Sequence, residues 1–244
     1  MSNKLLIKLA LLVVSAAGSV NAAPCIAQTL AYYEANFGEL TPCTLGSLSY
    51  YSFDFAKLSA AGTVTPNDIL ITPDIPTSSL LFSGVSSTTF NHVVPVGQRE
   101  QYLLSYVIDP PPIIAGDDLS LDPPTGPIFV SRWSCTNQPF DTTPSAGSIA
   151  GTDPSTYATA YKCLNDGKAP YFVQASPTTT LNDSVTFTLP ASYVFARMAI
   201  DLMPGEVRGL DAIVAQSTTV PEPGTLVPAA VALAGLLYFR KRRL

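Results

Sequence analysis

Acid–base catalysis in this chain would have to involve a single histidine. His92 is the only histidine among 244 residues, and it lies in the strand-like stretch Phe90-Asn91-His92-Val93-Val94. No Gly-x-Ser-x-Gly elbow occurs in the chain, so no Ser-His-Asp arrangement is recognisable. Paired carboxylates could serve a glycosidase, but any acidic protein supplies such pairs. We therefore predict a protein without catalytic activity and keep a hydrolase as the third hypothesis.

Three aspartates are the best candidates for a metal site: Asp117, Asp118 and Asp122. Calcium prefers oxygen ligands such as these, yet the EF-hand and nonapeptide patterns are both absent. A solvated turn explains the cluster more simply. We predict no cofactor, and calcium stays an open alternative.

Four cysteines, Cys25, Cys43, Cys135 and Cys163, could form disulfides or bind zinc. Zinc is disfavoured because no Cys-x-x-Cys occurs and the chain has one histidine. An even number of cysteines in an oxidising compartment is typical of disulfides, and three pairings are open. Proximity favours Cys25–Cys43 and Cys135–Cys163, each contributing about 3 kcal/mol in the chain-entropy description.

Aromatic side chains form the remaining candidate set, because such rings can stack on sugars. The alternative is that they fill the core and the interfaces of a β protein, as aromatic rings commonly do. We favour the core interpretation and keep carbohydrate binding as the second hypothesis. The residues are Tyr32, Tyr33, Tyr50, Tyr51, Tyr157, Tyr161, Tyr171 and Trp133.

The elements that must position these residues are mostly strands. Tyr51, Phe53 and Phe55 alternate with Ser52 and Asp54, which is the two-residue period of a half-buried strand. Gly, Pro, Asn and Asp separate this run from the later ones. Further strands are predicted at Asp68–Thr72, Ser79–Ser83, Gln101–Ile108, Ile128–Ser134, Tyr171–Ala175, Ser184–Leu189 and Tyr193–Leu202.

One short helix is expected ahead of the strands. Ile26, Leu30, Tyr33 and Phe37 recur at helical spacing, and Gly38 can end the helix. One short N-terminal helix followed by many strands predicts a mainly β fold. We expect an antiparallel two-sheet sandwich, with a jelly-roll variant left open.

Several details of this sandwich are specific enough to test. In the strand 193–202, Arg197 and Asp201 are expected to face out. The proline-rich segment Asp109–Pro127 is predicted to be a stiff surface excursion. The segment Thr136–Thr159, rich in Thr, Ser, Pro and Gly, is predicted to be an insertion restrained by the second disulfide. Leu210–Thr219 should lead out of the domain, with an exposed end.

The N-terminus has the three parts of a secretory signal peptide. Lys4 and Lys8 form a basic region, Leu9–Ala17 is apolar, and Val20-Asn21-Ala22 is a small-residue cleavage site. This order predicts cleavage between Ala22 and Ala23 by signal peptidase, after passage through the secretion translocon. The apolar part is too short to span a membrane.

The charge balance of the remaining body excludes nucleic acid as a partner. Six of the 13 basic residues lie in the two ends of the chain, whereas only Glu222 of the 18 acids does. The body from residue 23 to 219 therefore carries about ten net negative charges. Phosphate groups would be repelled by such a surface.

The C-terminus contains a motif, an apolar run and a basic cluster in that order. Val220-Pro221-Glu222-Pro223 precedes the uncharged run Thr225–Phe239, which Arg240-Lys241-Arg242-Arg243 follows. As a transmembrane helix the run would rise about 22 Å, which is short for a hydrocarbon core of about 30 Å. The basic cluster should stay cytoplasmic, so the body is expected outside the inner membrane.

This tripartite terminus resembles the PEP-CTERM sorting signal of Gram-negative bacteria. The resemblance covers residues 220–244 and implies recognition by an exosortase, a membrane-embedded cysteine protease. It further implies transient anchoring in the inner membrane, then release to the cell surface or to an exopolysaccharide-rich biofilm matrix. An ordinary C-terminal membrane anchor is the alternative.

The body resembles, more loosely, uncharacterised sandwich domains that precede this signal. The matching pieces are Cys43-Thr44-Leu45-Gly46-Ser47 leading into Tyr51-Ser52-Phe53, then Tyr102–Val107, Ala199-Ile200-Asp201 and Gln216-Ser217, and they imply no activity. We therefore expect a signal peptide at 1–22, an exported domain at 23–219 and a sorting signal at 220–244. The predicted function is that of an envelope or matrix structural or interaction protein, and the alternative is a carbohydrate-binding module for exopolysaccharide.

Overall fold

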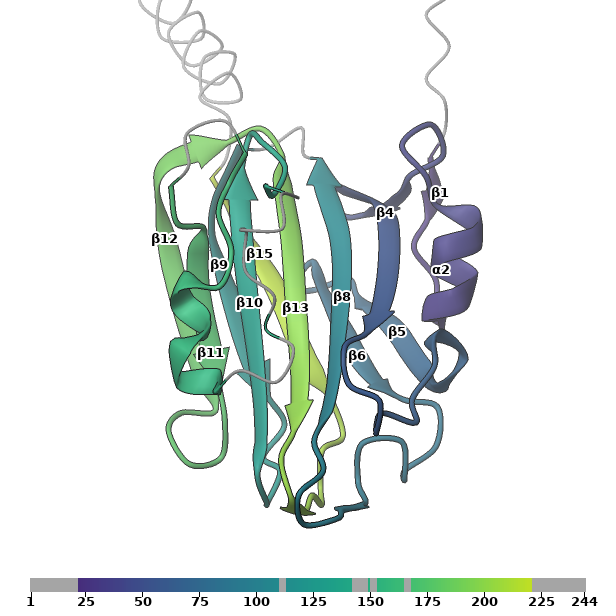
Figure 1. Cartoon of the computed structure of the whole chain (residues 1–244). Coiled ribbons are helices and arrows are strands. Elements are labelled where there is room, and N and C mark those ends of the chain that lie inside the picture. Colours follow the sequence, from purple (N-terminus) through teal and green to yellow (C-terminus); the bar gives the residue numbers. More distant parts are fainter. Residues whose placement is uncertain (1–21, 110–112, 142–148, 150–152, 165–167, 221–244) are drawn as a thin grey trace, which may run out of the picture.

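The computed structural model describes residues 22–109, 113–141, 149, 153–164 and 168–220. Two large sheets pack face to face in this body (Figure 1). The predicted mainly β, two-sheet sandwich is therefore confirmed. The signal peptide up to residue 21, Pro221-Glu222-Pro223, the predicted transmembrane helix 225–239 and the basic cluster 240–243 lie outside the described residues.

The first sheet has seven strands and carries the candidate site on its outer face. All its neighbouring strands are antiparallel except β1 and β3, which pair in parallel. In spatial order the strands are β1 (Ala23–Pro24), β3 (Cys43–Leu45), β4 (Leu48–Lys57), β8 (Glu100–Asp109), β13 (Val194–Leu202), β10 (Ile128–Thr136) and β11 (Tyr171–Ala175).

The second sheet has six antiparallel strands. In spatial order they are β12 (Asn182–Ala191), β9 (Ile113–Leu121), β15 (Ile213–Val220), β6 (Ser79–Gly84), β5 (Ile69–Asp74) and β2 (Gln28–Thr29). A small ribbon of β7 (Val93–Val94) and β14 (Gly205–Glu206) lies at one end of the sandwich. Short 3-10 helices occur at Pro66–Asp68 (η1) and Pro154–Thr159 (η2).

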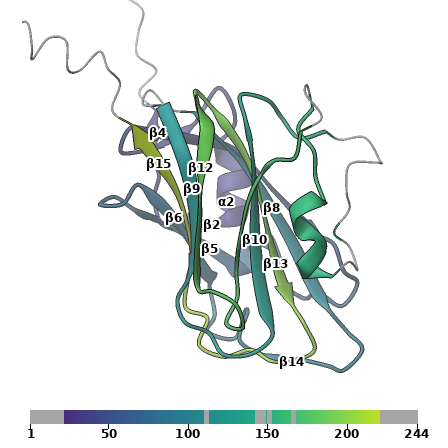
Figure 2. The same ribbon diagram turned by 90° about the vertical axis from the view of Figure 1, so that its left-hand side faces the viewer.

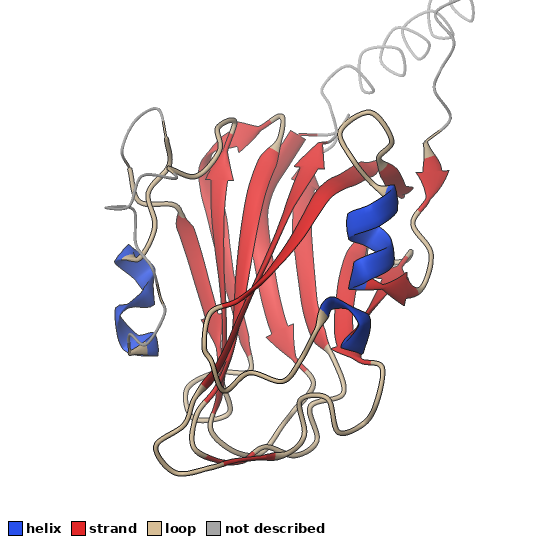
Figure 3. Cartoon of the chain, turned by 45° about the vertical axis from the view of Figure 1, so that its right-hand side comes forward, coloured by secondary structure: helices blue, strands red, loops and turns tan. Residues whose placement is uncertain are grey.

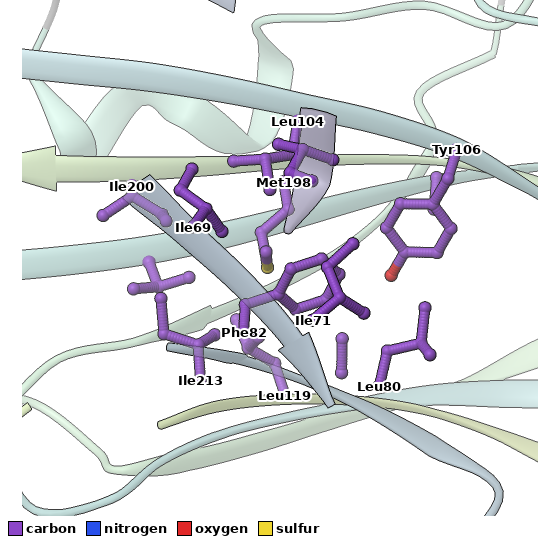
Figure 4. Close-up of a cluster of buried hydrophobic side chains, with 14 of the residues drawn as sticks. Ile69, Ile71, Leu80, Phe82, Leu104, Tyr106, Leu119, Met198, Ile200 and Ile213 are labelled. Carbon is purple, nitrogen blue, oxygen red and sulfur yellow. The ribbon is translucent and has the colours of Figure 1, made fainter. Parts of the chain in front are cut away.

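The main core lies between the two sheets (Figure 4). Leu104, Met198 and Ile200 from the first sheet meet Phe82 and Ile213 from the second. Alternate residues of each strand supply this layer, as the two-residue period predicted. In β13 the inward positions are those expected: Val194, Ala196, Met198, Ile200 and Leu202, all of them buried.

The N-terminal helix is present but shorter than predicted. Helix α2 spans Leu30–Asn36, and Thr29 caps it by accepting a hydrogen bond from the Tyr32 amide at 3.3 Å. Ile26 lies outside the helix because the residues before Leu30 pair with strands β3 and β5. In Figure 3 the helix lies beside the sheets, where it buries Leu30 and Tyr33.

The prediction of a surface excursion at Asp109–Pro127 is wrong. Strand β9 runs through it and pairs with both β12 and β15. Prolines at both ends of the segment suggested a loop, and Asp117 broke the apolar alternation. Asp117 is nevertheless buried, because Arg132 of the opposite sheet pairs with it at 2.9 Å.

The prediction that Leu210–Thr219 is an exit segment is also wrong for most of its length. Strand β15 lies between β9 and β6 in the second sheet, with Ile213 and Ala215 buried. The polar run Gln216–Thr219 resembles a linker in sequence, but neighbouring strands satisfy its backbone. Among the described residues, no helix has the length and hydrophobicity needed to cross a membrane.

Candidate functional site

The outer face of the seven-stranded sheet is partly covered by a disulfide-closed insertion. The disulfide joins Cys135, near the end of β10, to Cys163, and of the segment between them the structure describes residues 136–141, 149 and 153–162, which include η2. In Figure 2 the helical turn of η2 lies outside the seven-stranded sheet. The insertion buries a second cluster on this face, which comprises Trp133, Cys135, Phe140, Ile149, Tyr157, Tyr161, Cys163 and Ala199. The predicted Cys135–Cys163 disulfide, which closes this segment, is therefore confirmed.

Asp201 connects the insertion to the sheet. Its carboxylate accepts hydrogen bonds from Arg99 Nε at 2.7 Å, from Gln101 Nε2 at 3.3 Å and from the Tyr157 hydroxyl. Burial, followed by the hydrogen bond to Asp201, raises the pKa of Tyr157 above its ordinary value. The expectation that Asp201 faces solvent is wrong: it does lie on the outer face, but the insertion covers it and leaves it 1% exposed.

Beside the insertion, the same face is open and forms a groove of about 310 Å³. Pairing of β4, β8 and β13 places Tyr51 next to Val107, and Val107 next to Phe195. Two residues further along β8 and β13, on the same face, Ser105 lies next to Arg197. The lining residues are Glu39, Tyr51, Ser52, Ser105, Tyr106, Val107, Pro139, Phe140, Phe195, Ala196 and Arg197.

The groove combines aromatic rings with polar groups that are open to a ligand. Tyr51 and Phe195 are both half-buried, so each leaves part of its ring exposed. Within the described part of the chain, no side chain forms a hydrogen bond with the hydroxyl of Ser52 or of Ser105. A concave surface with apolar rings and a few polar groups is typical of a small-molecule or sugar site.

Arg197 is the cation of the groove. Its guanidinium carbon lies 4.5 Å from the centre of the Phe140 ring and 4.9 Å from that of Tyr161. These rings hold it by cation–π contacts. Burial lowers the pKa of Arg197 from its ordinary value, although Tyr161 and Asp54 oppose that shift.

The groove wall contains a strained residue. Ser52 has φ of 54°, in the left-handed region that non-glycine residues rarely adopt. It lies where the β4–β8 register shifts between Tyr51 and Asp54, and its amide donates to Phe37 O at 2.9 Å. A bulge of this kind changes the direction of neighbouring side chains and often accompanies a binding site.

We expect Ser52→Gly to stabilise the protein by about 0.5–1 kcal/mol, because glycine adopts positive φ without steric cost. Thermal unfolding measures the change, which corresponds to an increase in Tm of about 1–4 °C. Ser49→Gly, in the regular part of β4, is the matched control and should destabilise by about 0.5–1 kcal/mol. Equal destabilisation by the two changes would show that Ser52 is not strained.

The four cysteines pair as proximity favoured. Cys25–Cys43 has a Cα–Cα distance of 4.8 Å, and Cys135–Cys163 one of 5.7 Å. Phe140 forms an isolated bridge with Cys163, so the second disulfide supports the wall of the groove directly. Two disulfides indicate an oxidising, exported environment for the protein.

Most of the aromatic candidates are core residues, which is the role that the sequence analysis favoured over stacking on sugars. Tyr51 is the candidate that lines the groove, and Tyr32 is exposed on α2. Sequence reasoning did not single out Ser52, Ser105 or Phe195, which lie on three different strands. The buried members of the set are Tyr33, Tyr50, Tyr157, Tyr161 and Trp133, and Tyr171 is half-buried.

His92 takes part in a local chain of hydrogen bonds. Its Nε2 lies 3.0 Å from Glu100 Oε1, and the other Glu100 oxygen accepts from the Tyr102 hydroxyl. Burial, then the hydrogen bond to Glu100, raises the pKa of Tyr102 to about 12. Among the described residues, no serine or threonine hydroxyl is within hydrogen-bond distance of the His92 ring.

The aspartates considered for calcium do not form a solvated turn, and that prediction is wrong. Asp117 and Asp118 lie in β9, and Asp117 accepts hydrogen bonds from Ser217 at 2.6 Å and from Ser134. Asp122 follows the strand, and its amide donates to Ala212 O. Within the described ranges, no group of three or more His, Cys, Asp or Glu is placed to hold a metal ion.

The predicted signal-peptide cleavage site and Val220, the one residue of the predicted sorting motif that the structure describes, lie at one end of the sandwich. Ala22 is half-buried, and Ala23 begins β1, where it pairs with Cys43. Val220 ends β15, where it pairs with Ile113. Both strand ends lie at the top of Figure 1.

Comparisons with known proteins give weak likenesses. No protein-family model matches the sequence, and no curated protein matches it. Among solved structures, the chain is similar to TmCBM61 in complex with beta-1,4-galactotriose. The two sequences are 8% identical, the match covers 68% of this chain and 88% of that one, and the TM-score is 0.31. A protein of unknown function with a galectin-like fold from Bacillus subtilis has 8% identity, coverage of 69% and 91%, and a TM-score of 0.24.

A third similar structure comes from an enzyme. The enzymatically active domain of tailspike protein 4 from bacteriophage CBA120 has 13% identity and a TM-score of 0.25. The match covers 72% of this chain and 20% of that one. At such scores the likenesses carry no functional argument, so we interpret the site from its own geometry.

Proposed function

We propose that the body is an interaction protein that binds a polysaccharide in the groove between β4, β8 and β13. The observation that carries the proposal is the juxtaposition of the partly exposed rings of Tyr51 and Phe195 with the hydroxyls of Ser52 and Ser105. A sugar ring has apolar C–H faces, which pack on aromatic rings, and hydroxyls, which need hydrogen-bond partners. The groove supplies both kinds of contact on one rigid sheet.

Catalysis forms no part of this proposal. His92 is held by Glu100 in a different region, and the acid that lines the groove is Glu39, on the loop after α2. A glycosidase needs two carboxyl groups on opposite sides of the bond that it breaks. The groove instead offers rings, hydroxyls and a guanidinium, which suit binding without turnover.

A glycan array tests the proposal. The purified domain should bind a subset of glycans, and Tyr51→Ala or Phe195→Ala should weaken that binding about tenfold or more, since central aromatic contacts carry much of the energy of a binding site. Tyr32→Ala removes an exposed ring outside the groove and is the matched control. Absence of binding to every glycan, or equal effects of all three variants, would refute the proposal.

We further propose that the chain reaches the cell surface or extracellular matrix by the route that its two ends imply. The translocon and signal peptidase would act at Ala22–Ala23, and an exosortase-type protease at the signal beginning Val220-Pro221-Glu222-Pro223. Location of both positions at one end of the sandwich supports this route, because processing there leaves the fold intact. Exopolysaccharide outside the cell would then be the natural ligand, and the inner membrane a transient anchor.

A further inference from the structure

Arg197 differs from the other arginines of the described body in its partners. Arg99 pairs with Asp201, Arg132 with Asp117 and Arg208 with Glu206. Within the described residues, the guanidinium of Arg197 contacts the rings of Phe140 and Tyr161 and has no carboxylate within ion-pair distance. Among the residues that the structure describes, Arg197 is thus a cation held by aromatic rings and without an ion-pair partner.

Such a guanidinium is a strong site for a planar anion. The stacked rings restrict its motion, so little conformational entropy remains to be lost when a ligand binds. Its N–H groups can donate two parallel hydrogen bonds to one carboxylate, which is the geometry that arginine favours. Partial burial weakens competition from water and strengthens the pairing.

Two acidic residues, Glu39 and Asp54, lie near the groove, and among the described residues neither forms an ion pair with Arg197. Asp54 lies opposite Ser105, and Ser105 lies opposite Arg197, so two strand spacings, about 10 Å, separate the backbones of Asp54 and Arg197. Asp54 is exposed, so solvent and salt weaken its attraction for Arg197, although that attraction still opposes the fall in the pKa of Arg197. Glu39 lines the same groove from the loop after α2, and the structure shows no ion pair between it and Arg197.

We propose that the ligand of the groove is an acidic polysaccharide, whose sugar carboxylate pairs with Arg197 while its ring packs on Phe195 or Tyr51. This inference rests on the proposed function and adds the chemical class of the ligand. The net negative charge of the body opposes long-range attraction of such a polymer. Recognition therefore depends on the local contact with Arg197, and only glycans that place a carboxylate there should bind tightly.

The test uses an array of uronate-containing glycans, each beside its carboxyl-reduced neutral form. We expect the domain to bind the acidic form about 10- to 100-fold more tightly than the neutral form. This is the change in affinity that typically follows when one hydrogen-bonded charge pair is lost. Arg197→Gln should abolish the preference, and Arg197→Lys should keep part of it. Arg208→Gln, which removes an exposed arginine paired with Glu206, is the control and should change nothing.

The outcomes separate this inference from the function on which it rests. Equal binding of acidic and neutral forms, or a preference unchanged in Arg197→Gln, would overturn the inference and leave polysaccharide binding intact. Failure to bind any glycan would refute both. Thermal unfolding of each variant shows whether it is folded. If Arg197→Gln does not fold, Arg197→Lys still tests the inference, because it should show a reduced preference for the acidic form.

Discussion

Arg132→Met is expected to lower the free energy of unfolding by about 3–5 kcal/mol, because it leaves a buried carboxylate without its cation. Arg132 and Asp117 are each 1% exposed, and they join β10 of one sheet to β9 of the other. Arg132 also donates to Ser217 Oγ and to Gln216 O, both at 3.0 Å. It donates to Asp118 O as well, at 3.5 Å, so one side chain serves four acceptors in the second sheet.

Chemical denaturation measures this change, and two controls interpret it. Replacing both partners, Arg132→Met with Asp117→Leu, should recover part of the loss, since no buried charge is then left unpaired. The recovery is incomplete because the buried hydroxyls of Ser134 and Ser217 lose their acceptor. Arg208→Met breaks the exposed pair with Glu206 and should cost about 0–1 kcal/mol. A loss below about 1 kcal/mol for Arg132→Met would contradict the buried pairing.

Trp133→Ala should destabilise the domain by about 3–5 kcal/mol, because a large ring is lost from the cluster beneath the insertion. Trp133 is 0% exposed, and its ring centre lies 4.9 Å from that of Tyr161 and 5.5 Å from that of Phe172. Its Nε1 donates to Tyr157 O at 2.8 Å. Denaturation with limited proteolysis should show loss of stability and faster cleavage between residues 137 and 163.

Trp133→Phe separates packing from hydrogen bonding in this cluster. It keeps an aromatic ring and removes the donor to Tyr157 O, so we expect a smaller loss of about 1–3 kcal/mol. Unchanged proteolysis in Trp133→Ala would contradict the conclusion that this ring holds the insertion on the sheet.

Strands were predicted correctly where apolar residues of the sequence alternate in the same way as the buried residues of the fold. Strand β11 has the predicted bounds, and the inward residues of β13 were assigned correctly. Strands β9 and β15 were missed because partners distant in sequence stabilise their polar residues. No periodicity reveals that Arg132 neutralises Asp117, or that an insertion ending at Cys163 covers Asp201.

Only part of the candidate groove could be found from the sequence. Tyr51 was among the aromatic candidates, and Arg197 was expected on the outer face, where it lies. Phe195 and Ser105 come beside them only through the pairing of β13 and β8. The positive φ of Ser52 has no sequence signal, because serine seldom adopts it and a neighbouring bulge imposes it.

Export and processing of the body are the central claim, because a matrix polysaccharide is accessible only outside the cell. Intact-mass analysis of the protein recovered from the producing organism tests this claim most directly. We expect a chain that begins at Ala23, contains two disulfides and has been cut or modified near Val220-Pro221-Glu222-Pro223. A full-length chain with Met1 retained and four free thiols, recovered from the cytosol, would contradict it.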